Sequence, residues 1–394
     1  MTDTQKPVTR LLAAAAISLL IAGLSPRQGK ADQAASSDGH YMYVGTLDHK
    51  LLVIDEATED VVAEIPLGGI PRNTALSADQ KQLYIVTTRM LIEVVDLPSR
   101  KVVSSFNLAD GRSTPTIQEI TPDPLLPGSL SFDYSGLAVD PNGKYLYTTL
   151  RTAIKEIDQY RIEPAMFVAI DLANKKIAKA FHFPPEIDEG FGFVATFKVS
   201  PDGKLLYVFD DDILIYDLET FKQVDKIALS KPPYPGASPF RLSVSADPYD
   251  DPSTVTSVFV SVDPIVHKGL LGLASLNLLT RQVDYKPVGP ALPMLGFMIS
   301  PDRKLGYSVM YTSALGNRHT QWWVWDLQTH KVIKKREFES RPTFNFGLSG
   351  DGKKIYLFGS GPTIEVFDAA TLESIKFMDL KRDLTTNVIT LARR

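Results

Sequence analysis

The sequence contains no cysteine among its 394 residues. Disulfides, thiolate zinc sites and iron–sulfur clusters need cysteine sulfur, so none can form within this chain. The same absence excludes an attached c-type haem, which requires a Cys-x-x-Cys-His motif, and a quinone crosslinked through cysteine thioethers. Any such group in an assembly with this chain would belong to another polypeptide.

A charge bias of one sign is also missing, because 42 Lys and Arg residues nearly balance 46 Asp and Glu residues to a net charge of −4. Nucleic-acid-binding proteins usually carry a clustered basic surface, and membrane-surface proteins often carry a basic amphipathic helix. Neither pattern occurs. The sequence therefore favours neither nucleic acid nor a membrane surface as the partner.

Recognisable catalytic or metal-binding patterns are equally scarce. Gly347-Leu-Ser349-Gly-Asp lacks the final glycine of a Gly-x-Ser-x-Gly elbow, and no two of the six histidines have ligand spacing on one element. The acidic runs at 210–212 and 247–251 have oxygen ligands that could suit calcium, but they lack an EF-hand pattern, so solvated turns are favoured. No catalytic, cofactor-binding or metal-binding residue is assigned.

The N-terminus has the pattern of an export signal. Lys6 and Arg10 precede a fourteen-residue apolar run, 11–24, which as a helix would reach only about 21 Å, less than a bilayer core of about 30 Å. Small residues at 29 and 31 suit cleavage after Ala31. We expect a signal peptide over 1–31, a disordered linker over 32–39 and a periplasmic mature chain; an uncleaved anchor is the alternative.

One unit recurs along the rest of the sequence: a β-rich run, an Asp or Asn at a turn, a few polar residues and another β-rich run. The turn residue occurs seven times, at Asp55, Asp96, Asp171, Asp217, Asn277, Asp326 and Asp368. The shorter spacings between these positions, 41, 46, 49 and 42 residues, match one four-stranded propeller blade. The two longer spacings, 75 and 60, indicate blades with insertions.

A second turn precedes most of these units and reads Ser200-Pro-Asp-Gly-Lys in its fullest form. Proline, aspartate and glycine in this order are typical of hairpin turns, so the aspartates are interpreted as turn formers and not as catalytic acids. The pattern predicts an all-β fold: a seven-bladed β-propeller of four-stranded antiparallel blades over residues 40–394. The run 387–391 (NVITL) has no blade of its own, and we expect it to complete the first blade and close the ring.

Three tryptophans lie close together in HTQWWVWDL. Alternation along a strand would place Trp323 and Trp325 on one face and Trp322 on the other. Packing between blades is the favoured interpretation. A tryptophan-derived quinone is the alternative.

The insertions are the expected functional parts, because in a propeller the strands form the scaffold and the loops form the site. Long connections are predicted at 109–128, 151–164, 184–193, 231–240, 247–254 and 311–321. Aromatic and charged residues at their tips are candidates for a protein interface. The interface candidates are Tyr160, Phe191, Tyr234, Tyr249 and His319.

The repeated Ser-Pro-Asp-Gly-Lys turns and Asp hairpins resemble the YVTN-type propeller superfamily. A narrower resemblance connects LAVDPNGKYLYTTL (137–150), the inserted segment ending in DQYRIEPAMFVAIDL (158–172), IPLGGIPRNTALSADQKQLYIV (65–86) and the tail from Val366 to the β subunit of quinohemoprotein amine dehydrogenase. That subunit similarly has an insertion ending in a Tyr-x-x-x-Pro run. The segment 109–128 has no counterpart in it.

This resemblance implies a non-catalytic propeller subunit of a periplasmic enzyme that oxidises primary amines to aldehydes. Its partners would be a small subunit with cysteine tryptophylquinone and a larger subunit with two c-type haems, while this chain would hold no cofactor. Two other interpretations remain open. One is a stand-alone periplasmic YVTN-type propeller that binds a protein or surface ligand, and the other is a propeller hydrolase with calcium in its channel.

Overall fold

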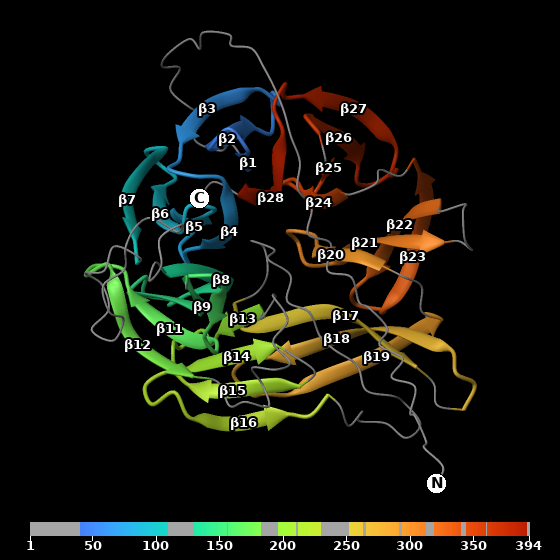
Figure 1. The fold of residues 1–394 in the computed structure, drawn as a ribbon. Coiled ribbons are helices and arrows are strands. Elements are labelled where there is room, and N and C mark those ends of the chain that lie inside the picture. Colours follow the sequence, from blue (N-terminus) through green and yellow to red (C-terminus); the bar gives the residue numbers. More distant parts are fainter. Residues whose placement is uncertain are drawn as a thin grey trace.

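The computed structural model describes residues 40–108, 130–155, 157–182, 196–209, 212–229, 252–262, 265–290, 294–312, 319–339, 344–359 and 361–391. Within these ranges the chain consists of β-strands and turns, and the strands form seven antiparallel sheets arranged as a seven-bladed β-propeller (Figure 1). The predicted fold class is confirmed. In the same ranges no helix is long and apolar enough to cross a membrane. The predicted signal peptide and linker, residues 1–39, lie outside the described residues.

The blades are numbered in chain order, and their strands are given from the channel outward. Blade 1 contains β28 (Leu384–Leu391), β1 (Tyr41–Thr46), β2 (Lys50–Asp55) and β3 (Val61–Pro66). Blade 2 contains β4 (Pro71–Leu76), β5 (Gln82–Thr87), β6 (Leu91–Asp96) and β7 (Lys101–Asn107). Blade 3 contains β8 (Leu130–Val139), β9 (Tyr145–Lys155), β11 (Met166–Asp171) and β12 (Lys176–His182), with β10 (Tyr160–Ile162) as an addition.

The other four blades follow the same order. Blade 4 contains β13 (Thr196–Val199), β14 (Leu205–Phe209), β15 (Ile213–Asp217) and β16 (Gln223–Ile227). Blade 5 contains β17 (Thr254–Val262), β18 (Gly269–Asn277) and β19 (Val283–Pro290). Blade 6 contains β20 (Met294–Ile299), β21 (Leu305–Thr312), β22 (His319–Asp326) and β23 (Lys331–Phe338), and blade 7 contains β24 (Phe344–Leu348), β25 (Lys354–Gly359), β26 (Thr363–Asp368) and β27 (Ser374–Asp379).

Two sheets depart from four strands. The sheet of blade 3 has five, because β10 pairs with a continuation of β9 beyond the blade. The sheet of blade 5 has three strands within the described part of the chain. They correspond to the second, third and fourth strands of the other blades, because the repeated turn at Asn277 joins β18 to β19. Residues 230–251, which precede β17, lie outside that part.

The hydrophobic core is divided into seven clusters, one at each contact between neighbouring blades. Alternate residues of β1 face different neighbours: Tyr41 and Tyr43 pack toward blade 2, whereas Met42 and Val44 pack toward blade 7. Both faces of such a strand are buried, which explains why the strands read as continuous apolar runs. Since one cluster joins blade 7 to blade 1, the ring is closed.

The C-terminal strand closes the ring as predicted. β28 pairs antiparallel with β1, with Tyr41 opposite Leu391 and Val44 opposite Val388, so the two ends of the described chain share one blade (Figure 1). The strand begins at Leu384, a few residues earlier than the sequence pattern indicated. Closure gives β1 a pairing partner on its inner side, an edge that would otherwise be open to other strands.

The repeated turns have the predicted construction. In the turn before β14, the Ser200 hydroxyl donates to Asp202 at 2.5 Å and accepts from the Leu205 N–H at 2.9 Å, and Gly203 has a positive φ of 70°. The same serine–aspartate hydrogen bond occurs in the turns that begin at Ser77, Ser300 and Ser349. Hydrogen bonds to serine lower the pKa of Asp79, Asp202 and Asp302, so these carboxylates are ionised turn formers.

The three tryptophans divide between two cores, as alternation predicts. Trp322 packs edge-on against Phe346 and Phe367 of blade 7, at centroid distances of 5.1 and 5.5 Å. Trp323 and Trp325 belong to the cluster between blades 5 and 6, where the Trp325 Nε1–H donates to the Ser308 hydroxyl at 2.8 Å. The tryptophans are therefore packing residues of the inter-blade cores.

Candidate interaction surface

Each blade has two different ends, because neighbouring strands run in opposite directions. At one end, short turns connect the first strand to the second and the third to the fourth. At the other end, the second strand connects to the third and the fourth leads to the next blade, by segments that range from three residues between β1 and β2 to 22 between β7 and β8 and 26 between β16 and β17. We call this second end the variable end. The inserted segments 109–128, 184–193, 231–240 and 311–321 all attach to strands there.

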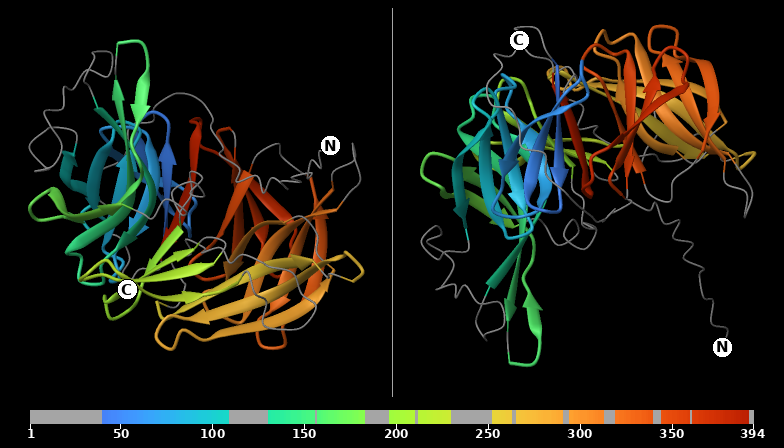
Figure 2. Two further views of the ribbon diagram at one scale, coloured as in Figure 1. Left: turned by 60° about the horizontal axis from the view of Figure 1, so that its bottom comes forward. Right: turned by 90° about the horizontal axis from the view of Figure 1, so that it is seen from above.

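Blade 3 continues beyond its neighbours at the variable end. Residues 145–150 of β9 pair with β11 inside the blade, and residues 153–155 pair with β10 outside it. Residues 130–133 of β8 accompany this continuation on the other side of β9. We call residues 130–133 and 151–162, without the undescribed 156, the arm. Figure 2 shows it in green, projecting from the ring.

The tip of the arm exposes an apolar side chain. Ile157 is 88% exposed, the highest value among the large hydrophobic residues of the described chain. Ile265, which is 82% exposed, and Val266 lie between β17 and β18, at the variable end of blade 5. Isoleucines this exposed bury little of their apolar surface within the monomer, so burial against a partner would be favourable.

The structure describes two of the five predicted interface residues. Tyr160 begins β10 and pairs with Lys155 in the arm. His319 begins β22 at the variable end of blade 6, is exposed, and has its Nδ1 3.7 Å from the Glu337 carboxylate. The two residues share the variable end but belong to blades 3 and 6, so they form no common cluster. Phe191, Tyr234 and Tyr249 lie outside the described residues.

Ile157 is absent from the predicted interface because only aromatic and charged tips of the insertions were expected to contact a partner. The signal that could have identified it is an isolated apolar residue within a polar hairpin, KEIDQY.

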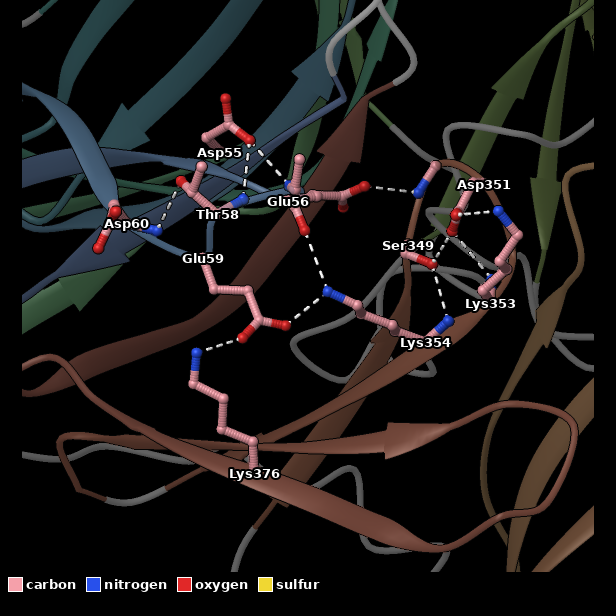
Figure 3. A network of polar contacts seen from close by, with 12 residues as sticks. Asp55, Glu56, Thr58, Glu59, Asp60, Ser349, Asp351, Lys353, Lys354 and Lys376 are labelled. Carbon is pink, nitrogen blue, oxygen red and sulfur yellow. Dashed lines mark hydrogen bonds and ion pairs between the residues drawn. The ribbon is translucent and has the colours of Figure 1, made fainter.

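A polar network at the short-turn end joins blade 1 to blade 7 (Figure 3). Glu56, in the turn between β2 and β3, is only 7% exposed and accepts a hydrogen bond from the Gly350 N–H at 2.8 Å. Lys354 donates to the Glu56 carbonyl at 3.1 Å and to Glu59 at 2.6 Å. Lys376 donates to the second oxygen of Glu59 at 2.5 Å. These contacts connect the first blade to the last, so the network helps to hold the ring closed.

The two glutamates of this network titrate differently. Burial raises the pKa of Glu56 to about 7, and the hydrogen bond from Gly350 only partly opposes it. Burial would also raise the pKa of Glu59, but hydrogen bonds from Lys354 and Lys376 outweigh it and lower that pKa. A raised carboxyl pKa is common in active sites. Here the carboxyl faces a neighbouring blade and no described cavity, so a structural role is the consistent interpretation.

Within the described ranges, no three His, Asp or Glu residues gather in a way that could hold a metal ion. The described pocket, of about 480 Å³, lies between blades 6 and 7 and is lined by Tyr307, Ile333, Lys334, Lys353 and Asp368 among others. Asp368 accepts a hydrogen bond from the Thr371 N–H at 2.6 Å, which lowers its pKa, so this carboxylate is a turn former beside two lysines. Among the described residues, the exposed side chains at the variable end are therefore the better candidates for a functional site, as a surface for contact with a partner.

No protein-family model and no curated protein matches this chain. Among solved structures, it is similar to dihydro-heme d1 dehydrogenase NirN in complex with DHE, with a TM-score of 0.50 and 15% identity over 93% of this chain and 77% of that one. It is also similar to a functionally unknown protein from Desulfotomaculum acetoxidans, with a TM-score of 0.53 and 10% identity over 90% of this chain and 98% of that one.

Kuenenia stuttgartiensis hydrazine synthase matches at a TM-score of 0.45 and 13% identity, over 90% of this chain and 99% of that one. At identities of 15% and 10%, the similarities to NirN and to the Desulfotomaculum acetoxidans protein support the propeller fold but no particular function.

Proposed function

We propose that this chain is a non-catalytic binding subunit, which holds a partner protein at the variable end of its blades. The arm is the observation that carries this proposal. Residues 153–155 of β9 pair with β10 and not with β11, so this hairpin extends past the blade, and Ile157 at its tip is 88% exposed. A paired extension with an exposed apolar tip suits contact with another macromolecule.

The more specific proposal is the β subunit of a quinohemoprotein amine dehydrogenase. The resemblance is most detailed at 158–172, the segment that contains β10 and β11. In such an assembly, a small subunit with cysteine tryptophylquinone would oxidise the primary amine, and electrons would pass to a subunit with two c-type haems. A chain without cysteine cannot attach either cofactor through a thioether, so its role would be support of the small subunit.

This proposal includes export. Residues 1–31 would direct the chain to the periplasm, where c-type haem subunits could assemble with it. A stand-alone propeller that binds a protein or a surface ligand is the second candidate. The same arm supports it, because an exposed apolar tip does not identify the partner.

Mild affinity purification of the tagged chain from its own cells tests these proposals. The expected result is a coloured complex with c-type haem absorption and a small quinone-bearing polypeptide, identified by mass spectrometry. A complex with another protein and without haem or quinone would reject the amine dehydrogenase subunit and retain the binding role. If the chain is recovered alone and colourless, even after crosslinking in the cells, both the amine dehydrogenase subunit and the binding role are rejected.

A further inference from the structure

The turn between the third and fourth strands of a blade places one residue against the preceding blade. This residue directly follows the repeated Asp or Asn, and in five of the seven blades it is a leucine: Leu97, Leu172, Leu218, Leu278 and Leu327. Each leucine belongs to, or packs against, the core cluster that its blade shares with the preceding one. The leucine therefore fills the space between two blades at the short-turn end.

Two blades depart from this pattern. Blade 1 has Glu56 at the position, and its buried carboxyl contacts the Gly350 N–H of blade 7. Blade 7 has Ala369, which follows Asp368 and precedes a second alanine, Ala370. All three of these blade 7 residues line the pocket of about 480 Å³ between blades 6 and 7. The pocket therefore lies at the place that a leucine side chain occupies between other blades.

A tyrosine on the other side of the pocket supports this comparison. Between blades 4 and 5, the third residue of β14, Tyr207, donates a hydrogen bond to the Leu278 carbonyl at 2.6 Å and so joins the two blades. Tyr307 is the third residue of β21 and lines the pocket. Burial, together with the charges of Asp302 and Asp368, raises the pKa of Tyr307 to about 12, so its hydroxyl keeps its proton. The pocket wall thus includes a neutral phenol.

Aliphatic side chains of blade 6 form another part of the wall. Leu305 belongs to β21, Val324 to β22 and Ile333 to β23. Val324 is buried, whereas Ile333 is 56% exposed, so this apolar wall extends from the core to the surface. Ligand pockets in proteins have volumes of about 300–1,000 Å³ and are mostly apolar, with a few polar groups that orient the ligand. The space between blades 6 and 7 has this size and this composition.

The charged residues of the lining are two lysines and one aspartate: Lys334, Lys353 and Asp368. The Asp368 carboxylate accepts hydrogen bonds from backbone N–H groups of its own turn, which lower its pKa, so its charge is stabilised there. Lys334 donates to the Ala370 carbonyl, which is a neutral group. Lys353 contacts Asp351 at 3.0 Å, but its side chain is 80% exposed, and ion pairs this exposed are weak. The lining therefore favours an anion.

We propose that the space between blades 6 and 7 binds a small organic monocarboxylate. The aliphatic or aromatic body of the ligand packs against the apolar wall of blade 6 and covers the exposed face of Ile333. Its carboxylate pairs with Lys334 and Lys353 at the mouth of the pocket. The site lies at the short-turn end, whereas the arm projects from the variable end, so this inference is independent of the proposed function.

Calorimetric titration of the full chain with phenylacetate and with phenylacetamide tests the site, because the two probes share an aromatic body and differ in charge. The wild type should bind one phenylacetate with a Kd of about 0.1–1 mM. It should bind phenylacetamide about fivefold or more weakly, since the amide forms no ion pair with the lysines. Lys353→Gln should weaken the binding of phenylacetate by about two- to fivefold.

Ala369→Leu restores the leucine that five other blades have and should fill the pocket. We expect this variant to bind phenylacetate at least about tenfold more weakly than the wild type. Its Tm without ligand should rise by about 1–3 °C, because the added side chain is buried between the blades. Ala173→Leu is the matched control: it makes the same change at an exposed position of the corresponding turn in blade 3 and should leave the binding unchanged.

Three results would overturn the proposal: no binding of phenylacetate to the wild type at up to about 10 mM, equal affinity for the two probes, or equal affinity of Ala369→Leu and the wild type for phenylacetate. If Ala369→Leu does not fold, Lys353→Gln decides. An affinity of Lys353→Gln for phenylacetate equal to that of the wild type would then reject the site.

Discussion

The carboxyl of Glu56 should make ring closure sensitive to pH. Its pKa is about 7 in the folded chain, against an ordinary value of 4.5, because burial disfavours the charged form. Between these two values the folded state binds more protons than the unfolded state, so stability falls as pH rises from about 4.5 to 7. At about 1.4 kcal/mol per pH unit, this difference corresponds to a loss of about 3 kcal/mol.

Glu56→Gln removes the titration while keeping the size of the side chain. The amide oxygen of the substituted side chain can still accept from the Gly350 N–H, and the NH₂ group occupies the position of the oxygen that has no partner. At pH 5 we expect the free energy of unfolding of the variant to equal that of the wild type or to be slightly lower. At pH 8 it should be the more stable of the two by about 1–3 kcal/mol.

Urea unfolding at 25 °C, followed by tryptophan fluorescence at pH 5, 6, 7 and 8, measures this difference. Glu219→Gln is the matched control, because Glu219 is an exposed glutamate in the turn before β16 and its replacement should give a small difference at every pH. The reasoning is refuted if the difference between Glu56→Gln and the wild type does not change with pH, or if it grows in favour of the wild type as pH rises.

One deletion and two substitutions, one of them with a control substitution, test the closure and the core by changes in Tm. Deleting residues 386–394 opens β1 to solvent and should lower the Tm by about 5 °C or more; a shift within error would reject the latch. Gly45→Ala places a Cβ 2.3 Å from a threonine hydroxyl and should cost about 1–3 kcal/mol, whereas Gly289→Ala, with no atom within 4 Å, should cost little; equal effects would contradict the packing. Trp325→Phe removes the buried hydrogen bond to Ser308 and should cost about 1–3 kcal/mol, and an unchanged Tm would count against that bond.

The sequence predicted the fold well because each blade repeats local chemistry. Turns such as Ser200-Pro-Asp-Gly-Lys determine their own geometry through hydrogen bonds within five residues, so they are readable without the rest of the chain. Closure by the C-terminal strand was also predictable, because seven copies of the repeat left 387–391 without a blade.

The candidate surface was only partly predictable. The pattern located the insertion at 151–164 but did not indicate that it forms a paired arm with Ile157 at its tip. The charge environment of Glu56 was not predictable, because it depends on a contact with Gly350, 294 positions away in the sequence.

Replacement of Ile157 by lysine tests the central claim, partner binding at the arm, most directly. Ile157 is 88% exposed, so Ile157→Lys should leave the Tm unchanged while placing a charge in the proposed contact. Val103→Lys, on the outer strand β7, is the matched control at a 56% exposed position. We predict that the Ile157→Lys chain, purified from its own cells, retains at most about one tenth of the partner held by wild type and Val103→Lys. Equal recovery of the partner with all three chains would contradict a binding role for the arm.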